Sequence, residues 1–220
     1  MRIAIIGGGV MGCATARALA QRGAKVMLLE RAVPGAEASS AAAGILGAQA
    51  ESHAPGPLHD MFVRARAGYE AWAGELRAET GIDIGYRATG VLCIASDVDG
   101  HAKLVRDVGW QTKAGLRAEL VHGAEALLIE PELSRDVKTA AYFPDDAQDD
   151  PPMLLRALAA SLARAKVKVR SGATVASLII EKKKCLGVAL EDGSEVRADA
   201  TVLAAGSWSS LVPGTAGLFP

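Results

Sequence analysis

Apolar positions near the N-terminus come in two short runs separated by a stretch of helical character. Residues 3–6 are apolar and end at glycine, which is typical of a buried parallel strand. Residues 10–22 are rich in alanine and other good helix formers, and Gly23 suits the position after a helix C-terminus. Residues 25–29 form a second apolar run. The pattern predicts a strand, a helix and a second strand, which together make a βαβ unit.

The rest of the chain alternates between helical and strand periodicity. Residues 58–80 have the spacing of a long amphipathic helix. Asp192-Gly193 is the turn signal of a β-hairpin. The order predicts an α/β fold in which a Rossmann-type domain, residues 1–50 and 150–210, is interleaved with an α+β domain, residues 80–145. Further helices are expected at 98–114, 125–129 and 151–166, and strands at 90–95, 139–143, 168, 175–180, 186–190, 195–196 and 200–204.

Three glycines follow the first predicted strand with the spacing of a dinucleotide-binding turn. Gly7 allows a tight turn, Gly9 lets the backbone approach a pyrophosphate, and Gly12 lets the helix pack closely on the strand. Glu30, at the end of the second predicted strand, is placed to accept hydrogen bonds from ribose hydroxyls. Arg31 would suit a 2′-phosphate, but the carboxylate of Glu30 would repel one, so NADP is disfavoured. These residues predict a dinucleotide site and leave both FAD and NAD open.

Composition and charge argue against several other classes of protein. The 220 residues are 50% hydrophobic and 22% charged, as in a globular protein with a sizeable core. A formal net charge of −1 and an aromatic content of 4% give no support for binding nucleic acid or an anionic membrane. No apolar stretch reaches the ~18 residues needed to span a bilayer. The N-terminal apolar run is broken by glycines and leads into the second predicted strand. We therefore interpret it as mature protein rather than a signal peptide, and expect a cytoplasmic location.

Cysteine, histidine and aspartate positions match no metal or redox motif. The three cysteines lack a CxxC pair, which predicts a reducing compartment, no disulfides and no disulfide-reductase activity. The four histidines have no metal spacing, so we expect surface or hydrogen-bonded side chains. Residues 145–150 include four aspartates without the spacing of a calcium loop. We interpret them as a solvated loop, with Asp150 capping the next helix.

Four segments resemble those of the glycine oxidase and D-amino-acid oxidase family of FAD-dependent amine oxidoreductases. They are IIGGGVMG with Glu30 and Arg31, ASSAAAGILGAQAE at 38–51, YFPDDAQDDP at 142–151, and VLAAGSWSSLVPG at 202–214. The segment at 142–151 resembles the thiamine-pathway glycine oxidases in particular. The resemblance favours FAD over NAD. It implies that residues 1–50 and 150–210 form an FAD-binding domain and that residues 80–145 form part of a substrate domain.

The same resemblance implies which residues hold the cofactor. Residues 39–40 would donate hydroxyls toward the pyrophosphate, and residues 43–45 would lie beside the flavin. Val175 matches a backbone contact to adenine, although it equally suits a plain core valine. Residues 204–206 end a strand at the carboxyl edge of the sheet, where ligands bind, whereas Trp208 is expected to be core packing. The expected cofactor residues are Gly7, Gly9, Val10, Met11, Gly12, Glu30, Arg31, Ser39, Ser40, Ala43, Gly44, Ile45, Val175, Ala205 and Gly206.

The activity implied by the resemblance is oxidative deamination of a small amino acid such as glycine. FAD accepts a hydride from the α-carbon, the imine hydrolyses to an oxo acid, and O₂ is reduced to H₂O₂. The implied partners are a small-molecule amino-acid substrate and either identical subunits or a companion chain. The family's substrate-binding arginine and tyrosine have no counterpart in residues 1–220. We therefore expect a fragment that is not a competent oxidase alone. A non-catalytic flavin- or nucleotide-binding module and an NAD-dependent dehydrogenase remain as alternatives.

Overall fold

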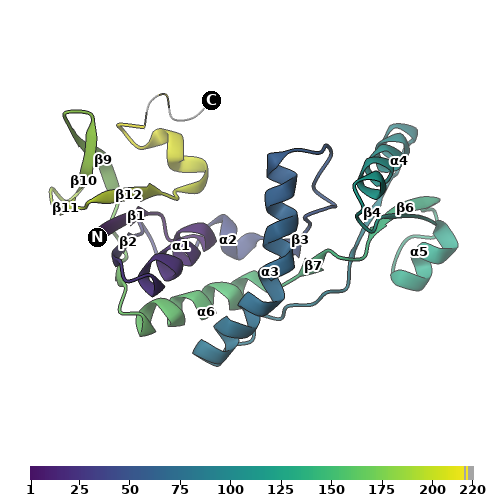
Figure 1. Ribbon diagram of the computed structural model, residues 1–220, viewed down its shortest axis with the longest axis horizontal. Coiled ribbons are helices and arrows are strands. Elements are labelled where there is room, and N and C mark those ends of the chain that lie inside the picture. Colours follow the sequence, from purple (N-terminus) through teal and green to yellow (C-terminus); the bar gives the residue numbers. More distant parts are fainter. Residues whose placement is uncertain (216, 218–220) are drawn as a thin grey trace. The chain divides into compact units, whose positions relative to one another are not determined.

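The chain divides into two compact units in the computed structural model, which describes residues 1–215 and 217 (Figure 1). The first unit contains Met1–Ala42, Glu75–Ile84 and the described residues from Pro151 onward. The second unit contains Ala43–Gly74 and Gly85–Asp150. Each unit is therefore assembled from segments that are separated in the sequence.

The boundary after Ala42 corrects the sequence-based expectation that the first segment extends to residue 50. β3 (Ile45–Leu46) pairs antiparallel with β7 (Ala147–Gln148), which belongs to the second unit. The backbone N–H groups of Gln49 and Ala50 both donate to the carboxylate of Asp146. These contacts join residues far apart in the sequence, and a hydrophobic pattern does not encode them.

A parallel sheet of four strands forms the centre of the first unit. Its order is β12 (Ala200–Leu203), β1 (Arg2–Ile6), β2 (Lys25–Leu29) and β8 (Lys168–Arg170). Within it, Ile5 pairs with Val202 on one side and with Leu28 on the other. α1 (Val10–Gln21) connects β1 to β2, so the predicted βαβ unit is confirmed. The apolar runs are buried along both strands because each lies between two hydrogen-bonded neighbours.

The two faces of the parallel sheet have different neighbours. On one face Gly12 of α1 lies over Leu28, and α1 also packs against α6 (Pro151–Arg164). On the other face an antiparallel sheet is built from β9 (Val175–Glu181), β10 (Lys184–Leu190) and β11 (Glu195–Arg197). Leu29 shares a buried cluster there with Val188 and Leu190. The hairpin predicted at residues 192–193 joins β10 to β11 and is confirmed.

An antiparallel sheet with the order β4 (Val91–Ile94), β6 (Thr139–Phe143) and β5 (Glu119–His122) organises the second unit. α4 (Val98–Lys113) covers it with Leu104 and Val108, which pack against Ala141 and Phe143. The unit also contains α5 (Gly123–Ile129) and most of α3 (Pro57–Thr80). The helices match the predicted ones closely. The sequence did not predict β3, β5 or β7, since runs this short carry little periodicity.

The acidic loop at residues 145–150 is partly buried, which corrects its interpretation as solvated. Asp146 is fully buried and accepts hydrogen bonds from the backbone of Gln49 and from Nη1 of Arg66 at 2.5 Å. Asp149 is also buried and accepts a hydrogen bond from the Tyr69 hydroxyl. Burial raises the pKa of both Tyr69 and Asp149. Partners in α3 compensate these carboxylates for their lost hydration.

His59 corrects the expectation of surface or hydrogen-bonded histidines. Its side chain is buried, and its Nδ1 atom has no hydrogen-bond partner within the described chain. The imidazole instead packs edge-to-face on Trp110, with ring centroids 4.8 Å apart. Residue spacing alone does not reveal this neighbour, because His59 and Trp110 lie far apart in the sequence.

Several kinds of feature are not found among the described residues. No group of three or more His, Cys, Asp or Glu side chains is arranged to hold a metal ion. All three cysteines are free thiols. Among the helices formed within residues 1–215, none combines the length and apolar character needed to cross a membrane.

Candidate functional site

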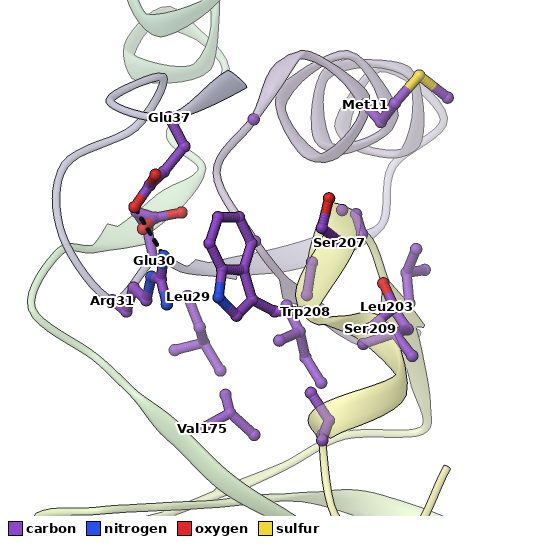
Figure 2. A pocket seen from close by; sticks show the side chains of 18 of the residues that line it. Met11, Leu29, Glu30, Arg31, Glu37, Val175, Leu203, Ser207, Trp208 and Ser209 are labelled. Atoms are coloured by element: carbon purple, nitrogen blue, oxygen red, sulfur yellow. Dashed lines mark hydrogen bonds and ion pairs between the residues drawn. The ribbon is translucent and has the colours of Figure 1, made fainter. Parts of the chain in front are cut away.

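A cavity of about 660 Å³ opens in the first unit at the carboxyl ends of β12, β1 and β2 (Figure 2). Ligands of open α/β sheets bind at this edge, and the volume is within the range of small-molecule sites. Around the cavity are the turn after β1, the start of α1, the loop after β2, residues 173–175 and η1 (Gly206–Leu211). All the lining residues belong to the first unit.

The turn after β1 depends on two glycines that contact backbone atoms. Gly7 has a φ of +103°, and a Cβ atom there would lie 2.4 Å from the carbonyl oxygen of Ala204. A Cβ atom at Gly12 would lie 1.9 Å from the carbonyl oxygen of Gly7. Neither position accepts a side chain without movement of the backbone. The tight turn and the close helix packing predicted from these glycines are both confirmed.

The N-terminus of α1 faces the cavity without a side-chain cap of its own. Gly9 is the N-cap residue, and the backbone N–H of Val10 donates to Oγ of Ser39 at 3.0 Å. Ser39 lies in the short helix α2 (Ala38–Ala41). A Cβ atom at Gly9 would approach that hydroxyl to 3.0 Å. Helix amides and a hydroxyl that converge in this way favour an anionic ligand such as a diphosphate.

Glu30 follows β2 at the edge of the same cavity, and its side chain is buried. Its Oε2 atom accepts a hydrogen bond from the backbone N–H of Gly8 at 2.7 Å, and Oε1 accepts one from Ala32 at 2.9 Å. Each carboxylate oxygen can accept a further hydrogen bond. The two backbone contacts fix the carboxylate where it can accept hydrogen bonds from a ligand's hydroxyl groups.

Cys13 lies behind the turn, in the first turns of α1. It is buried, and its Sγ atom lies 3.3 Å from the carbonyl oxygen of Gly8. Burial, together with the charge of Glu30, raises the pKa of the Cys13 thiol to about 11. The thiol is therefore protonated at neutral pH and is a poor nucleophile.

Arg31 and Trp208 form one wall of the cavity. Cζ of Arg31 lies 4.0 Å from the centre of the Trp208 ring, and its Nη2 atom forms an ion pair with Glu37 at 2.7 Å. Figure 2 shows the Trp208 indole between Arg31 and the side of the cavity formed by η1. Trp208 is 38% exposed. The expectation that it is core packing was therefore wrong.

The comparisons with known proteins agree with this site. Residues 2–220 match the family model DAO, described as "FAD dependent oxidoreductase". The chain belongs to this family. It is 35% identical over 218 residues to glycine oxidase from Geobacillus kaustophilus, covering 98% of this chain and 57% of that protein. It is 34% identical over 215 residues to the bifunctional protein ThiO/ThiG from Nostoc sp., covering 96% of this chain and 32% of that protein.

Solved structures of glycine oxidases have a fold similar to that of this DAO-family chain. Glycine oxidase from Bacillus cereus is similar with a TM-score of 0.85 and 36% identity, covering 96% of this chain and 56% of that one. The structure from Geobacillus kaustophilus gives a TM-score of 0.87 and 35% identity, covering 95% of this chain and 56% of that one. The chain thus spans about half the length of the glycine oxidases it matches.

FAD, the cofactor of the DAO family, fits the donors and acceptors around the cavity. The uncapped amides of α1 and the Ser39 hydroxyl suit its diphosphate, and the Glu30 carboxylate suits its ribose hydroxyls. A Cβ atom at Gly9 would lie 3.0 Å from the Ser39 hydroxyl at this end of the cavity, so glycine leaves the backbone accessible there. When bound, FAD supplies a hydride acceptor.

The structure brings most of the expected cofactor residues to this cavity. Gly12 and Ser40 do not line it: Gly12 packs against Gly7, and the Ser40 hydroxyl donates to the carbonyl of Glu37. Residues 43–45 lie in the second unit. Whether each residue contacts FAD remains a prediction. Those that line the cavity are Gly7, Gly9, Val10, Met11, Glu30, Arg31, Ser39, Val175, Ala205 and Gly206.

Three residues important to the site were not identified as such from the sequence. Gly8 donates its N–H to Glu30, although only the flanking glycines belong to the recognised spacing. Glu37 forms an ion pair with Arg31 across a loop that carries no motif. Trp208 lies within the VLAAGSWSSLVPG segment, but its position in the cavity depends on how η1 turns after β12.

Proposed function

We propose that the first unit binds FAD and that the whole protein oxidises a small amino acid, with glycine as the substrate. The amine would be converted to an imine and then an oxo acid, and O₂ would be reduced to H₂O₂. Because the chain spans about half the length of its glycine oxidase relatives, this activity is proposed for the whole protein. The relatives named glycine oxidase support the substrate class.

The observation that carries the proposal is the position of the Glu30 carboxylate. It is buried beside the glycine turn, at the carboxyl edge of a parallel sheet, with one backbone hydrogen bond on each oxygen. Glu37 is a second carboxylate in the same wall and is paired with Arg31. A 2′-phosphate would meet the unfavourable charge of Glu30, while the ion pair with Glu37 offsets the favourable charge of Arg31, which disfavours NADP.

The proposed roles of the chain's own residues follow from their positions. The amides at the start of α1 and the Ser39 hydroxyl would donate to the diphosphate, and Glu30 would accept from the ribose. Residues 173–175 and 205–206 would contact the adenosine and flavin parts through small side chains and backbone. We propose the second unit, which includes residues 43–45, as part of the substrate domain. We extend the proposal to a cytoplasmic enzyme of thiamine biosynthesis.

Ligand titrations test the cofactor assignment. Purified chain would be titrated with FAD, FMN and NAD⁺, with binding followed by flavin fluorescence or by calorimetry. Since the proposed contacts are to diphosphate and ribose, we expect FAD to bind well and FMN, which lacks the adenosine diphosphate part, to bind weakly. Preferential binding of NAD⁺ would contradict the proposal.

Peroxide release tests the proposed reaction independently. The full-length gene product, loaded with FAD, would be mixed with glycine, sarcosine, D-alanine or L-alanine, and H₂O₂ would be measured with a coupled peroxidase. We expect glycine to support turnover. Flavin reduction by glycine without H₂O₂ release in air would identify a dehydrogenase instead of an oxidase.

A further inference from the structure

The segment η1 lines the cofactor cavity but buries none of its own six residues. Two of them carry large apolar side chains, Trp208 and Leu211, which are 38% and 70% exposed. Both line the cavity. When a ligand covers apolar groups that border a cavity and are exposed to water, the free energy of the complex falls because apolar surface is removed from water.

Buried residues hold η1 in place only beyond its C-terminal end. Gly206 at its start has a φ of +54° and open space around the position of a Cβ atom. After its end, Val212 is buried in the cluster that contains Leu190, and Thr215 is buried as well. The segment is thus anchored beyond its C-terminal end, while none of its own residues is buried and most of them line the cavity.

The Arg31 guanidinium has two partners, Glu37 and Trp208. The ion pair between Arg31 and Glu37 is solvent-exposed, at 42% and 49% of the two side chains. An exposed ion pair alone does little to order two flexible side chains. The indole adds a second restraint, because the guanidinium stacks on its face at 4.0 Å. Together these two contacts restrain the Arg31 guanidinium in the cavity wall that also contains Glu30.

We propose that Trp208 is a positioning residue of the cofactor site: its indole holds the guanidinium of Arg31 at the ribose end and becomes covered when the adenosine diphosphate part of the cofactor enters. This inference rests on the proposed FAD binding. It assigns η1 the role of a wall at one end of the cavity. The proposed role also explains why η1, which has no buried residues, contains an exposed tryptophan.

Tryptophan accessibility tests the covering of Trp208. In a variant carrying Trp72→Phe and Trp110→Phe, Trp208 is the only tryptophan, and ADP serves as a probe that lacks the strongly quenching flavin. We expect ADP to reduce acrylamide quenching of Trp208 fluorescence at least twofold. If this variant does not fold, the same change is measured as the difference between wild type and Trp208→Phe. ADP binding without a change in the accessibility of Trp208 would overturn the proposed covering of Trp208 but would leave the proposed cofactor site standing. Absence of ADP binding to folded protein would overturn the proposed cofactor site as well.

Affinity measurements test the positioning role. We expect Trp208→Ala to weaken ADP binding by about three- to tenfold, the size of a cation–π contact. Trp208→Phe should restore most of the affinity, because a phenyl ring still stacks on a guanidinium. Leu128→Ala, an exposed apolar residue in the second unit, is the control and should bind ADP as the wild type does. Equal affinity in Trp208→Ala and wild type would contradict the proposal. Equal losses in the alanine and phenylalanine variants would also contradict it.

Discussion

The backbone N–H of Gly8 donates a hydrogen bond of 2.7 Å to Oε2 of Glu30, which joins the turn after β1 to the end of β2. A Cβ atom at Gly8 would lie 3.0 Å from Cβ of Glu30, so a larger residue would crowd this contact. The carboxylate is thereby held in place before any ligand arrives. Preorganisation of this kind reduces the entropy lost on binding.

Replacing the Glu30 carboxylate should weaken FAD binding. Glu30→Gln keeps the size of the side chain but removes its charge, so the hydrogen bonds to Gly8 and to ribose both become weaker. A hydrogen bond to a charged group contributes about 1.5–3 kcal/mol, which corresponds to a loss of roughly 10- to 100-fold in affinity. Flavin fluorescence titration would measure it. The exposed Glu195→Gln variant is the control, and wild-type affinity in Glu30→Gln would contradict the role given to this residue.

Two glycines in helices should respond to alanine in opposite directions. At Gly12 a Cβ atom would lie 1.9 Å from the carbonyl of Gly7, so we expect Gly12→Ala to lower the free energy of unfolding by about 3 kcal/mol or more. Gly68 lies in α3 with no atom within 4 Å of a Cβ atom. Gly68→Ala should raise stability by about 0.5–1 kcal/mol through helix propensity. Urea denaturation measures both, and a stable Gly12→Ala protein would contradict the close packing described.

The buried thiol of Cys13 should make stability depend on alkaline pH. Its pKa is raised by burial and by Glu30 from 9.0 to about 11, so the folded protein keeps a proton that the unfolded chain loses. The contribution is fully present below about pH 9 and is lost as pH rises toward 11, by up to about 2 kcal/mol. Urea denaturation between pH 8 and 10.5 would show a smaller decline in Cys13→Ala than in wild type. Parallel pH profiles in the two proteins would rule this effect out.

The sequence was sufficient to predict the strand, helix and strand that form one side of the cofactor cavity. Strand, helix and strand in residues 2–29 follow from apolar runs and glycine spacing, since local composition determines them. The stack of Arg31 on Trp208 could not be predicted, because these residues meet only after η1 turns back over the sheet. The domain boundary after Ala42 was missed for a similar reason, since β3 and β7 are too short to show a period.

The stability of the second unit should depend on the buried ion pair between Asp146 and Arg66. Asp146 is fully buried and bonds to Arg66, whose side chain is 11% exposed. Asp146→Asn should lower the free energy of unfolding by about 3–5 kcal/mol, because it leaves the guanidinium without a charged partner. Asp145 forms an exposed pair with Arg117, so Asp145→Asn is a matched control that should change stability little. Similar losses in both variants, measured by thermal denaturation, would contradict the distinction.

The first unit, through residues 1–42 and the described residues from Pro151 onward, forms the proposed FAD site. The visible absorption spectrum of the purified chain, recorded before and after incubation with FAD and removal of free cofactor, tests this most directly. We expect flavin bands that stay with the protein and release FAD on denaturation, together with a marked loss of these bands in Glu30→Ala. A folded chain that retains no flavin after incubation, or one that retains it equally well in Glu30→Ala, would contradict the account.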